Sequence, residues 1–291
     1  MTGLQISVSN AIGQLQLQQQ SFINFTANAC NSFNMTMIFQ GTVIVDWGDG
    51  TSTSITNATS SSQAFNKTYS SAFTGLVRIG GQYNNVTSFT NSVGLGISTT
   101  AKELGKFTGL LTLDIRNHLT LTGDVIDLPR VTTTLLLLNL SNATLTGNAI
   151  DLPRVTTSLI LQGLPNLTLT GTTIDLPRVT TNLTLLTVQN LTLTGNAINL
   201  PLSTDIFIIN TNSTITNPTN GVLKTVKSRT QISQTTKLSV EDTDRYLNDS
   251  AFYSTTWSSL RTITLSSLGR TSASDAAVTT LNGRSVTITL V

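Results

Sequence analysis

A strict sequence repeat is the feature that most constrains the fold of this chain. The phrase Ile-Asp-Leu-Pro-Arg-Val-Thr-Thr begins at Ile126, Ile150 and Ile174, and the prolines at 129, 153, 177 and 201 keep one interval of 24, as do the glycines at 123, 147, 171 and 195. A fixed period of this length is typical of stacked-repeat proteins. Each unit carries two short apolar runs, such as 159–161 and 167–170, which cannot form a core alone. Parallel strands stack at about 4.8 Å, so we expect about five units to form the coils of a right-handed parallel β-solenoid over residues 102–220.

Charged residues recur in the repeat as an acid followed three positions later by a base. The last unit has Asn199 and Leu202 at these positions, so the acid and the base are lost together. This joint loss predicts pairing within each coil, as a solvated structural ladder of low energy. The alternative function is an arginine stripe that binds acidic sugars or phosphate. The predicted ladder consists of Glu103 with Lys106, Asp127 with Arg130, Asp151 with Arg154, and Asp175 with Arg178.

The only histidine of the chain, His118, falls at a repeat position that asparagine occupies in the other units. Stacked amides can bridge the turns of adjacent coils, and an imidazole can replace an amide as donor and acceptor. A structural role is therefore favoured over general-base catalysis. The asparagines of this second ladder are Asn142, Asn166 and Asn190.

The repeat resembles that of leucine-rich repeat proteins in Leu152-Pro153, Val155, Leu159-Ile160-Leu161 and Asn166, with one extra residue before the strand. The resemblance covers the repeat region only. Threonines stand where that family usually has other residues, which leaves a narrower β-solenoid open as an alternative.

The region 21–101 alternates between apolar and polar residues as strands do, and it contains the phrase Asp46-Trp47-Gly48-Asp49-Gly50-Thr51. An Asp-Gly pair after a β-branched run indicates a hairpin. The phrase resembles the signature of β-sandwich domains of the polycystic-kidney-disease (PKD) type, which implies a sandwich here, with residues 84–101 as a connector. Asp46 and Asp49 are weak candidates for a calcium site, because two carboxylates fall short of the oxygen shell that calcium prefers. A turn above a buried Trp47 is the favoured interpretation.

The ends of the chain differ from the repeat. Residues 1–20 predict either an extended N-terminal arm or the first strand of the next region. Residues 221–291 predict a small α/β cap with a helix from the Ser239 cap to about 252, a strand at 260–265, a helix at 272–281 and a strand at 285–291. This ending, with the repeat and the sandwich phrase, resembles repeat proteins of Bacteroidota and their phages, which implies an exposed protein used for display or adhesion.

Composition excludes several functions. The net charge is +2 with no basic run, so nucleic-acid binding is not expected. A single cysteine, Cys30, permits no intrachain disulfide. No apolar segment approaches the length of a membrane span, and residues 1–20 lack the pattern of a secretory signal. The polar residues are mostly Thr, Asn and Ser, a composition typical of extracellular proteins. A protein with this composition and without a secretory signal is what we expect of a phage particle.

These observations predict a structural virion protein, a spike or vertex component for host attachment. Its expected partners are other virion proteins, copies of itself, and a host glycan or receptor, and no cofactor is expected. No catalytic set or metal spacing is apparent, so the chain is not expected to be an enzyme. The alternatives are a bacterial cell-surface adhesin and, less favoured, a carbohydrate-active enzyme.

Overall fold

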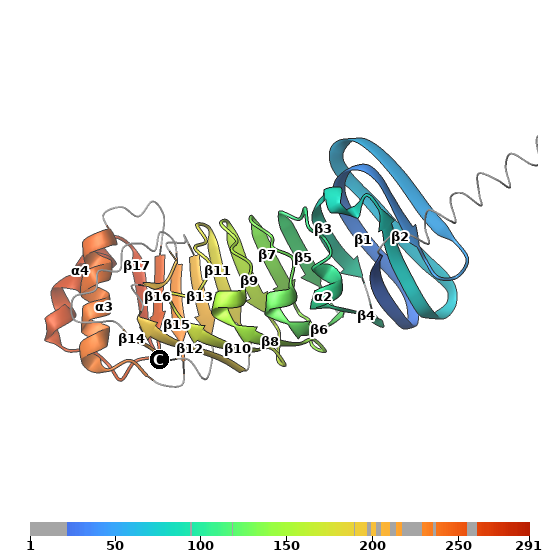
Figure 1. Ribbon diagram of the computed structural model, residues 1–291. Coiled ribbons are helices and arrows are strands. Elements are labelled where there is room, and N and C mark those ends of the chain that lie inside the picture. The colour runs from blue at the N-terminus through green and yellow to red at the C-terminus, as the bar shows by residue number, and fades with distance from the viewer. Residues whose placement is uncertain are drawn as a thin grey trace, which may run out of the picture.

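The computed structural model is mainly β and elongated, and it has helices at one end (Figure 1). It describes residues 22–93, 95–117, 119–188, 190–196, 199–201, 205–209, 214–216, 229–234, 237–254 and 261–291. Residues 1–20 lie outside this part, as does His118. The strands are β1 (Ile23–Asp46), β2 (Ser52–Gly81), β3 (Val86–Val93), β4 (Ile97–Thr100), β5 (Thr112–Arg116), β6 (Thr120–Asp124), β7 (Thr134–Leu138), β8 (Thr144–Asn148), β9 (Ser158–Gln162), β10 (Thr168–Thr172), β11 (Asn182–Leu186), β12 (Asn190–Asn196), β13 (Asp205–Ile209), β14 (Thr214–Thr216), β15 (Arg229–Ser233), β16 (Arg261–Leu265) and β17 (Val286–Leu290). The helical elements are η1 (Tyr83–Asn85), α2 (Ala101–Leu104), η2 (Val125–Asp127), η3 (Ala149–Asp151), α3 (Val240–Tyr253), η6 (Ser272–Ser274) and α4 (Asp275–Gly283).

The N-terminal region is built on β1 and β2, which pair antiparallel along most of their length. Side chains of a strand alternate between its two faces. Accordingly Phe33, Met35, Met37 and Phe39 are fully buried, whereas the residues between them are partly exposed. A period of two in the sequence therefore becomes one apolar face.

The repeats contribute strands to two parallel ladders. The long ladder runs through β3, β5, β7, β9, β11, β13, β15, β16 and β17. The short ladder runs through β4, β6, β8, β10, β12 and β14. Leucines such as Leu135, Leu159 and Leu183 pair across the long ladder and are fully buried, so neighbouring repeats share one core.

The short ladder has a different register from the sequence repeat. Thr170 pairs with Asn148, 22 residues earlier in the chain, whereas Asn182 in the long ladder pairs with Ser158, 24 residues earlier. An offset of two residues keeps every side chain on its own face of the strand. The leucines of the short ladder consequently stay buried although the glycine of one repeat lies opposite a leucine of the next.

Residues 84–101, expected to be a connector, contain two strands. β3 pairs antiparallel with β1 and parallel with β5, and β4 pairs antiparallel with β1 and parallel with β6. Val86, Phe89 and Ile97 are buried, so a passage rich in serine and glycine still supplies apolar side chains to the core. Hydrogen bonds therefore continue from the N-terminal region into the repeats.

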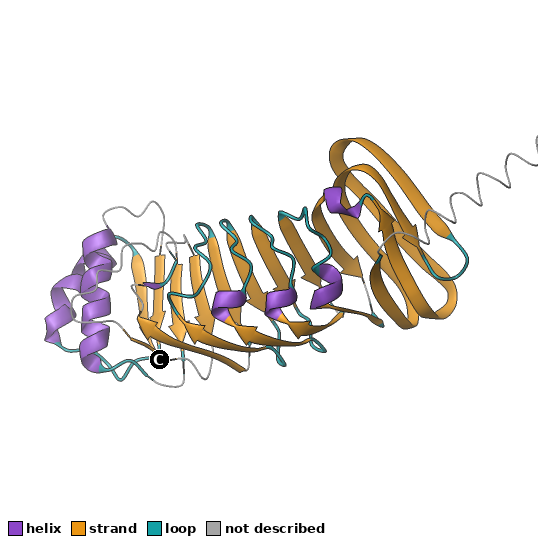
Figure 2. Ribbon diagram, in the orientation of Figure 1, coloured by secondary structure: helices purple, strands orange, loops and turns teal. Residues whose placement is uncertain are grey.

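The C-terminal helices and strands occur where the sequence predicts them, although the second helix opens as η6 and continues as α4. The Ser239 hydroxyl accepts from the backbone N–H of Asp242 at 3.0 Å, which confirms the predicted cap of α3. β16 and β17 extend the long ladder in parallel, and α3 and α4 lie at the end of the stack (Figures 1 and 2). Tyr246 and Leu247 of α3 and Leu281 of α4 are buried.

Candidate functional site

Three rows of side chains line one edge of the repeats, where the short ladder passes into helical turns. Figure 2 shows the turns η2 and η3 side by side along the stack. The turns place the same side chains at the same position in successive repeats. We call them the Ile row (Ile126, Ile150 and Ile174), the Asp row (Asp127, Asp151 and Asp175) and the Arg row (Arg130, Arg154 and Arg178). The side chains of the Ile row are 47%, 53% and 56% exposed, an uncommon setting for isoleucine. The Arg row is exposed as well.

Each arginine of the Arg row bonds to the backbone of the following repeat. Nη1 of Arg130 donates to the carbonyl of Asp151 at 3.2 Å, and Nη1 of Arg154 donates to the carbonyl of Asp175 at 3.1 Å. Nη1 of Arg178 donates to the carbonyl of Asn199 at 2.7 Å. The arginines therefore join neighbouring repeats, and the acceptor is a main-chain oxygen that any residue can supply.

This arrangement corrects the prediction that acid and base pair within each repeat. In the described part of the chain, no salt bridge links Asp127 to Arg130, Asp151 to Arg154, or Asp175 to Arg178. The Asp175 carboxylate instead accepts from the N–H and hydroxyl of Thr172 at 2.9 and 2.8 Å, and these bonds lower the pKa of Asp175. The acid and the base are three residues apart, a spacing typical of ion pairs on a helix. Here the stretch between them is a turn followed by a proline, and the arginine is directed to the next repeat.

Only the first predicted pair forms, and its role differs from that of the others. Nζ of Lys106 lies 2.7 Å from Oε2 of Glu103 and also donates to the carbonyl of Phe22 at 2.8 Å. Oε2 of Glu103 accepts from the backbone N–H of Asn24 at 2.8 Å and from its side-chain amide at 3.0 Å. This pair therefore fastens the first repeat to β1.

Arginine 154 provides a direct test of this corrected arrangement. Arg154→Gln is expected to lower the free energy of unfolding by about 0.5–1 kcal/mol, because the bond to the Asp175 carbonyl is lost. Asp151→Asn should leave that bond intact, so the two effects should add in a double-mutant cycle measured by urea denaturation. A coupling energy clearly above about 0.5 kcal/mol would restore pairing between Asp151 and Arg154.

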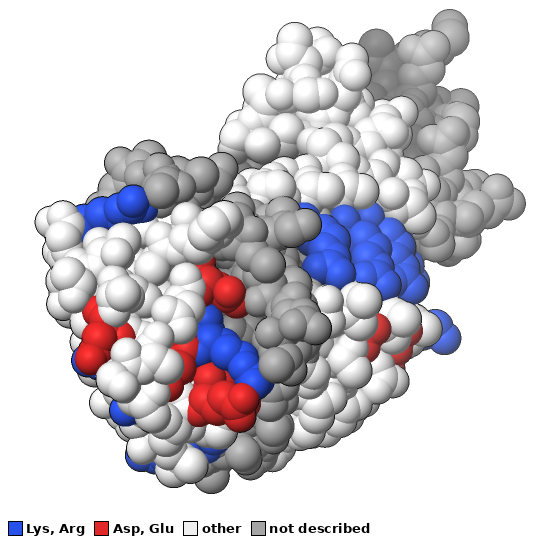
Figure 3. Space-filling view, turned by 90° about the vertical axis from the view of Figure 1, so that its left-hand side faces the viewer, with Lys and Arg blue, Asp and Glu red and all other residues white. Residues whose placement is uncertain are grey.

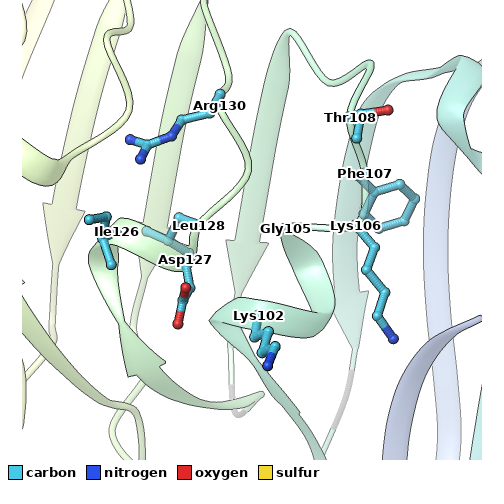
Figure 4. A pocket seen from close by; sticks show the side chains of 9 residues that line it. All are labelled: Lys102, Gly105, Lys106, Phe107, Thr108, Ile126, Asp127, Leu128 and Arg130. Carbon is cyan, nitrogen blue, oxygen red and sulfur yellow. The ribbon is translucent and has the colours of Figure 1, made fainter.

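A pocket of about 460 Å³ opens at the start of the rows, between α2 and η2 (Figure 4). Leu128 and Phe107, both buried, belong to its lining, while Lys102, Asp127 and Arg130 supply charges. Figure 4 shows Arg130 at one end and Lys102 at the other. The volume lies within the range of small-ligand sites, roughly 300–1,000 Å³.

Sequence reasoning missed this pocket because the first repeat is spaced differently. Leu113 pairs with Leu135 across the long ladder, 22 residues later in the chain. Leu135 pairs in turn with Leu159, 24 residues later. Leu113 follows Leu104 by nine positions, whereas Leu135 follows Leu128 by seven. This local change of spacing was the available signal.

Among the described residues of the predicted amide ladder, Asn142, Asn166 and Asn190, no amide bonds to another amide. Nδ2 of Asn166 donates to the carbonyl of Ser141 at 3.2 Å, which bridges two repeats as predicted. Asn142 and Asn190 are exposed.

Asp46 and Asp49 lie in the turn between β1 and β2 and bind groups of the protein itself. Asp46 accepts from the N–H of Gly48 at 2.9 Å. Asp49 lies 2.6 Å from Nζ of Lys67, and its pKa is lowered to about 2 by hydrogen bonds from Lys67 and Thr51. Trp47 between them is buried and donates to the Thr53 hydroxyl at 2.9 Å, as expected for the turn.

Figure 3 shows one large patch of Lys and Arg side chains on a flank of the molecule, with Asp and Glu side chains below it, and smaller groups of both kinds elsewhere on this face. No group of three or more potential metal-binding side chains occurs among the described residues. None of the described helices has the length and apolar character that crossing a membrane requires.

No family model, curated protein or solved structure matches the chain. The functional assignment therefore rests on the residues and geometry described above.

Proposed function

We propose that this chain is a structural protein of a bacteriophage virion, a spike or vertex component that projects from the particle and contacts the host. The observation that carries the proposal is the hydrogen-bonded continuity of the molecule. Pairing runs from β2 and β1 into β3 and β4, and from there through the long ladder to β17 and through the short ladder to β14. A chain joined in this way is suited to hold one end at a fixed distance from the other (Figure 1).

The finer fold belongs to the same proposal. Residues 102–220 are a right-handed parallel β-solenoid of the leucine-rich type, and residues 21–101 are a β-sandwich of the PKD type. The parallel ladders and the buried Trp47 turn support these assignments. Residues 1–20 attach the protein to the particle, while the repeats and the cap face outward.

Immunogold labelling of the source culture tests the location. Antibodies against the purified protein should decorate free phage particles at fixed positions. Label confined to bacterial surfaces would overturn the virion assignment in favour of the adhesin alternative.

Deletion of residues 1–20 tests the orientation. The truncated protein should remain folded and bind host cells but fail to enter particles, as measured by mass spectrometry of purified virions. Normal incorporation of the truncated protein would contradict the attachment role of this segment.

A further inference from the structure

We propose that the Arg row and the adjoining pocket bind an acidic polysaccharide with one carboxylate on each sugar. This inference rests on the proposed function, because it names the ligand class of a host-facing surface. Its evidence is separate and lies in the three edge rows and the pocket.

The arginines are held in place but retain donors for a ligand. In each case Nη1 is fixed by a carbonyl of the next repeat. Among the described residues, Arg130 and Arg154 make no other hydrogen bond, and Arg178 adds a 3.4 Å contact to the Ile174 carbonyl. A guanidinium anchored on one nitrogen loses less conformational entropy on binding, and its remaining N–H groups match the geometry of a carboxylate.

The spacing of the row fits a polymer. Successive arginines belong to successive repeats, which stack at about the distance between parallel strands, ~4.8 Å. This distance is close to the length of one sugar ring in an extended chain. A chain with a carboxylate on every sugar can therefore contact several arginines at once, and weak single contacts are multiplied by avidity.

The other two rows select among anionic polymers. Asp127 is exposed, and the carboxylates of Asp127 and Asp151 accept no hydrogen bond within the described residues, so both are available to sugar hydroxyls. The same carboxylates repel a chain with a higher density of negative charge, such as nucleic acid or polyphosphate. The exposed Ile row offers an apolar surface to the C–H groups of the sugar rings.

The pocket lies at one end of the Arg row and can bind the end of the polysaccharide chain. Arg130 belongs both to the Arg row and to the pocket lining, and Lys102 has no salt-bridge partner in the described part of the chain. Lys106 is occupied by Glu103 and the Phe22 carbonyl. Uronate residues at the chain end can therefore contact Arg130 and Lys102 separately, one at each side of the pocket.

Binding of the purified full chain to immobilised polygalacturonate tests the inference without particles or cells, so its result is independent of the virion assignment. Dextran serves as the neutral polysaccharide and polyphosphate as the denser polyanion. The test variant carries Arg130→Gln, Arg154→Gln and Arg178→Gln. The matched control carries Arg78→Gln, Arg116→Gln and Arg270→Gln, which removes the same charge from arginines that pair with Asp46, Asp114 and Asp275.

The natural chain should bind polygalacturonate in preference to both other polymers. The Arg-row variant should bind at least about tenfold more weakly although its circular dichroism spectrum shows that it remains folded, while the control variant retains binding. Equal loss in both variants would reduce the effect to net charge and overturn the inference. Absence of polygalacturonate binding by the natural chain, or preference for polyphosphate, would overturn it as well.

Discussion

Replacing Phe89 by alanine is expected to lower the free energy of unfolding by about 3–5 kcal/mol. Phe89 lies on β3 and is fully buried. Its ring centroid is 6.0 Å from that of Phe25 on β1 and 5.2 Å from that of Phe107 in the first repeat. The substitution therefore opens a cavity where the core of the N-terminal region meets the core of the repeats.

Denaturation followed by both tryptophan fluorescence and circular dichroism measures this effect. Coincident transitions in the natural chain would indicate that the two regions unfold together, and Phe89→Ala should separate them. Phe252→Ala is the matched control, because that side chain is 72% exposed and should change stability little. A loss below about 1 kcal/mol for Phe89→Ala would contradict a shared core.

Local patterns in the sequence predict much of this fold. Ser239 caps α3, β16 and β17 are parallel strands, and Trp47 is buried in a tight turn. The cap and the turn depend on residues close together in the chain, where spacing and side-chain chemistry determine the conformation. The parallel pairing of β16 and β17 joins residues 25 positions apart and follows from the strand–helix–strand order. The mainly β class follows from the same alternation.

Features that depend on the register between neighbouring repeats are not predicted from the sequence. The partner of Arg154 is a backbone carbonyl 21 residues away, which leaves no trace in residue identity because every residue has a carbonyl. The strands β3 and β4 escape prediction for a related reason, since their pairing with β1 is settled by the register of distant residues. The pocket lies where the interval between paired residues of the long ladder changes from 22 to 24, a change that the strand register reveals.

The glycines at 123, 147, 171 and 195 end the sequence Leu-Thr-Gly in each repeat, and they are explained partly by the sequence and partly by the register of the short ladder. Their recurrence predicts positive φ or close backbone approach, and Gly147 has φ of 144°. The register of the short ladder adds the reason for close approach. A Cβ at Gly147 would lie 2.4 Å from Cγ2 of Val125, and a Cβ at Gly171 would lie 2.8 Å from Cβ of Ala149. Val125 and Gly147 are 22 residues apart, as are Ala149 and Gly171. Paired residues of β8 and β10 have the same interval of 22.

Gly147→Ala is accordingly expected to lower the free energy of unfolding by about 2–4 kcal/mol, from backbone strain and overpacking together. Gly50→Ala separates the two causes, because Gly50 has φ of 84° but a Cβ there would meet nothing within 4 Å. That control should cost about 1 kcal/mol. Gly283→Ala, with open space and no positive φ, should be nearly neutral.

Val125→Ala provides the decisive arm of the experiment. If the methyl group of Gly147→Ala collides with Val125, the double variant should lose clearly less stability than the sum of the single losses, by at least about 1 kcal/mol in urea denaturation. The next repeat already has alanine at the position of Val125, because Gly171 faces Ala149 there. Additive losses would show that the two residues do not touch, and the register of the short ladder would then fail as the reason why glycine recurs in every repeat.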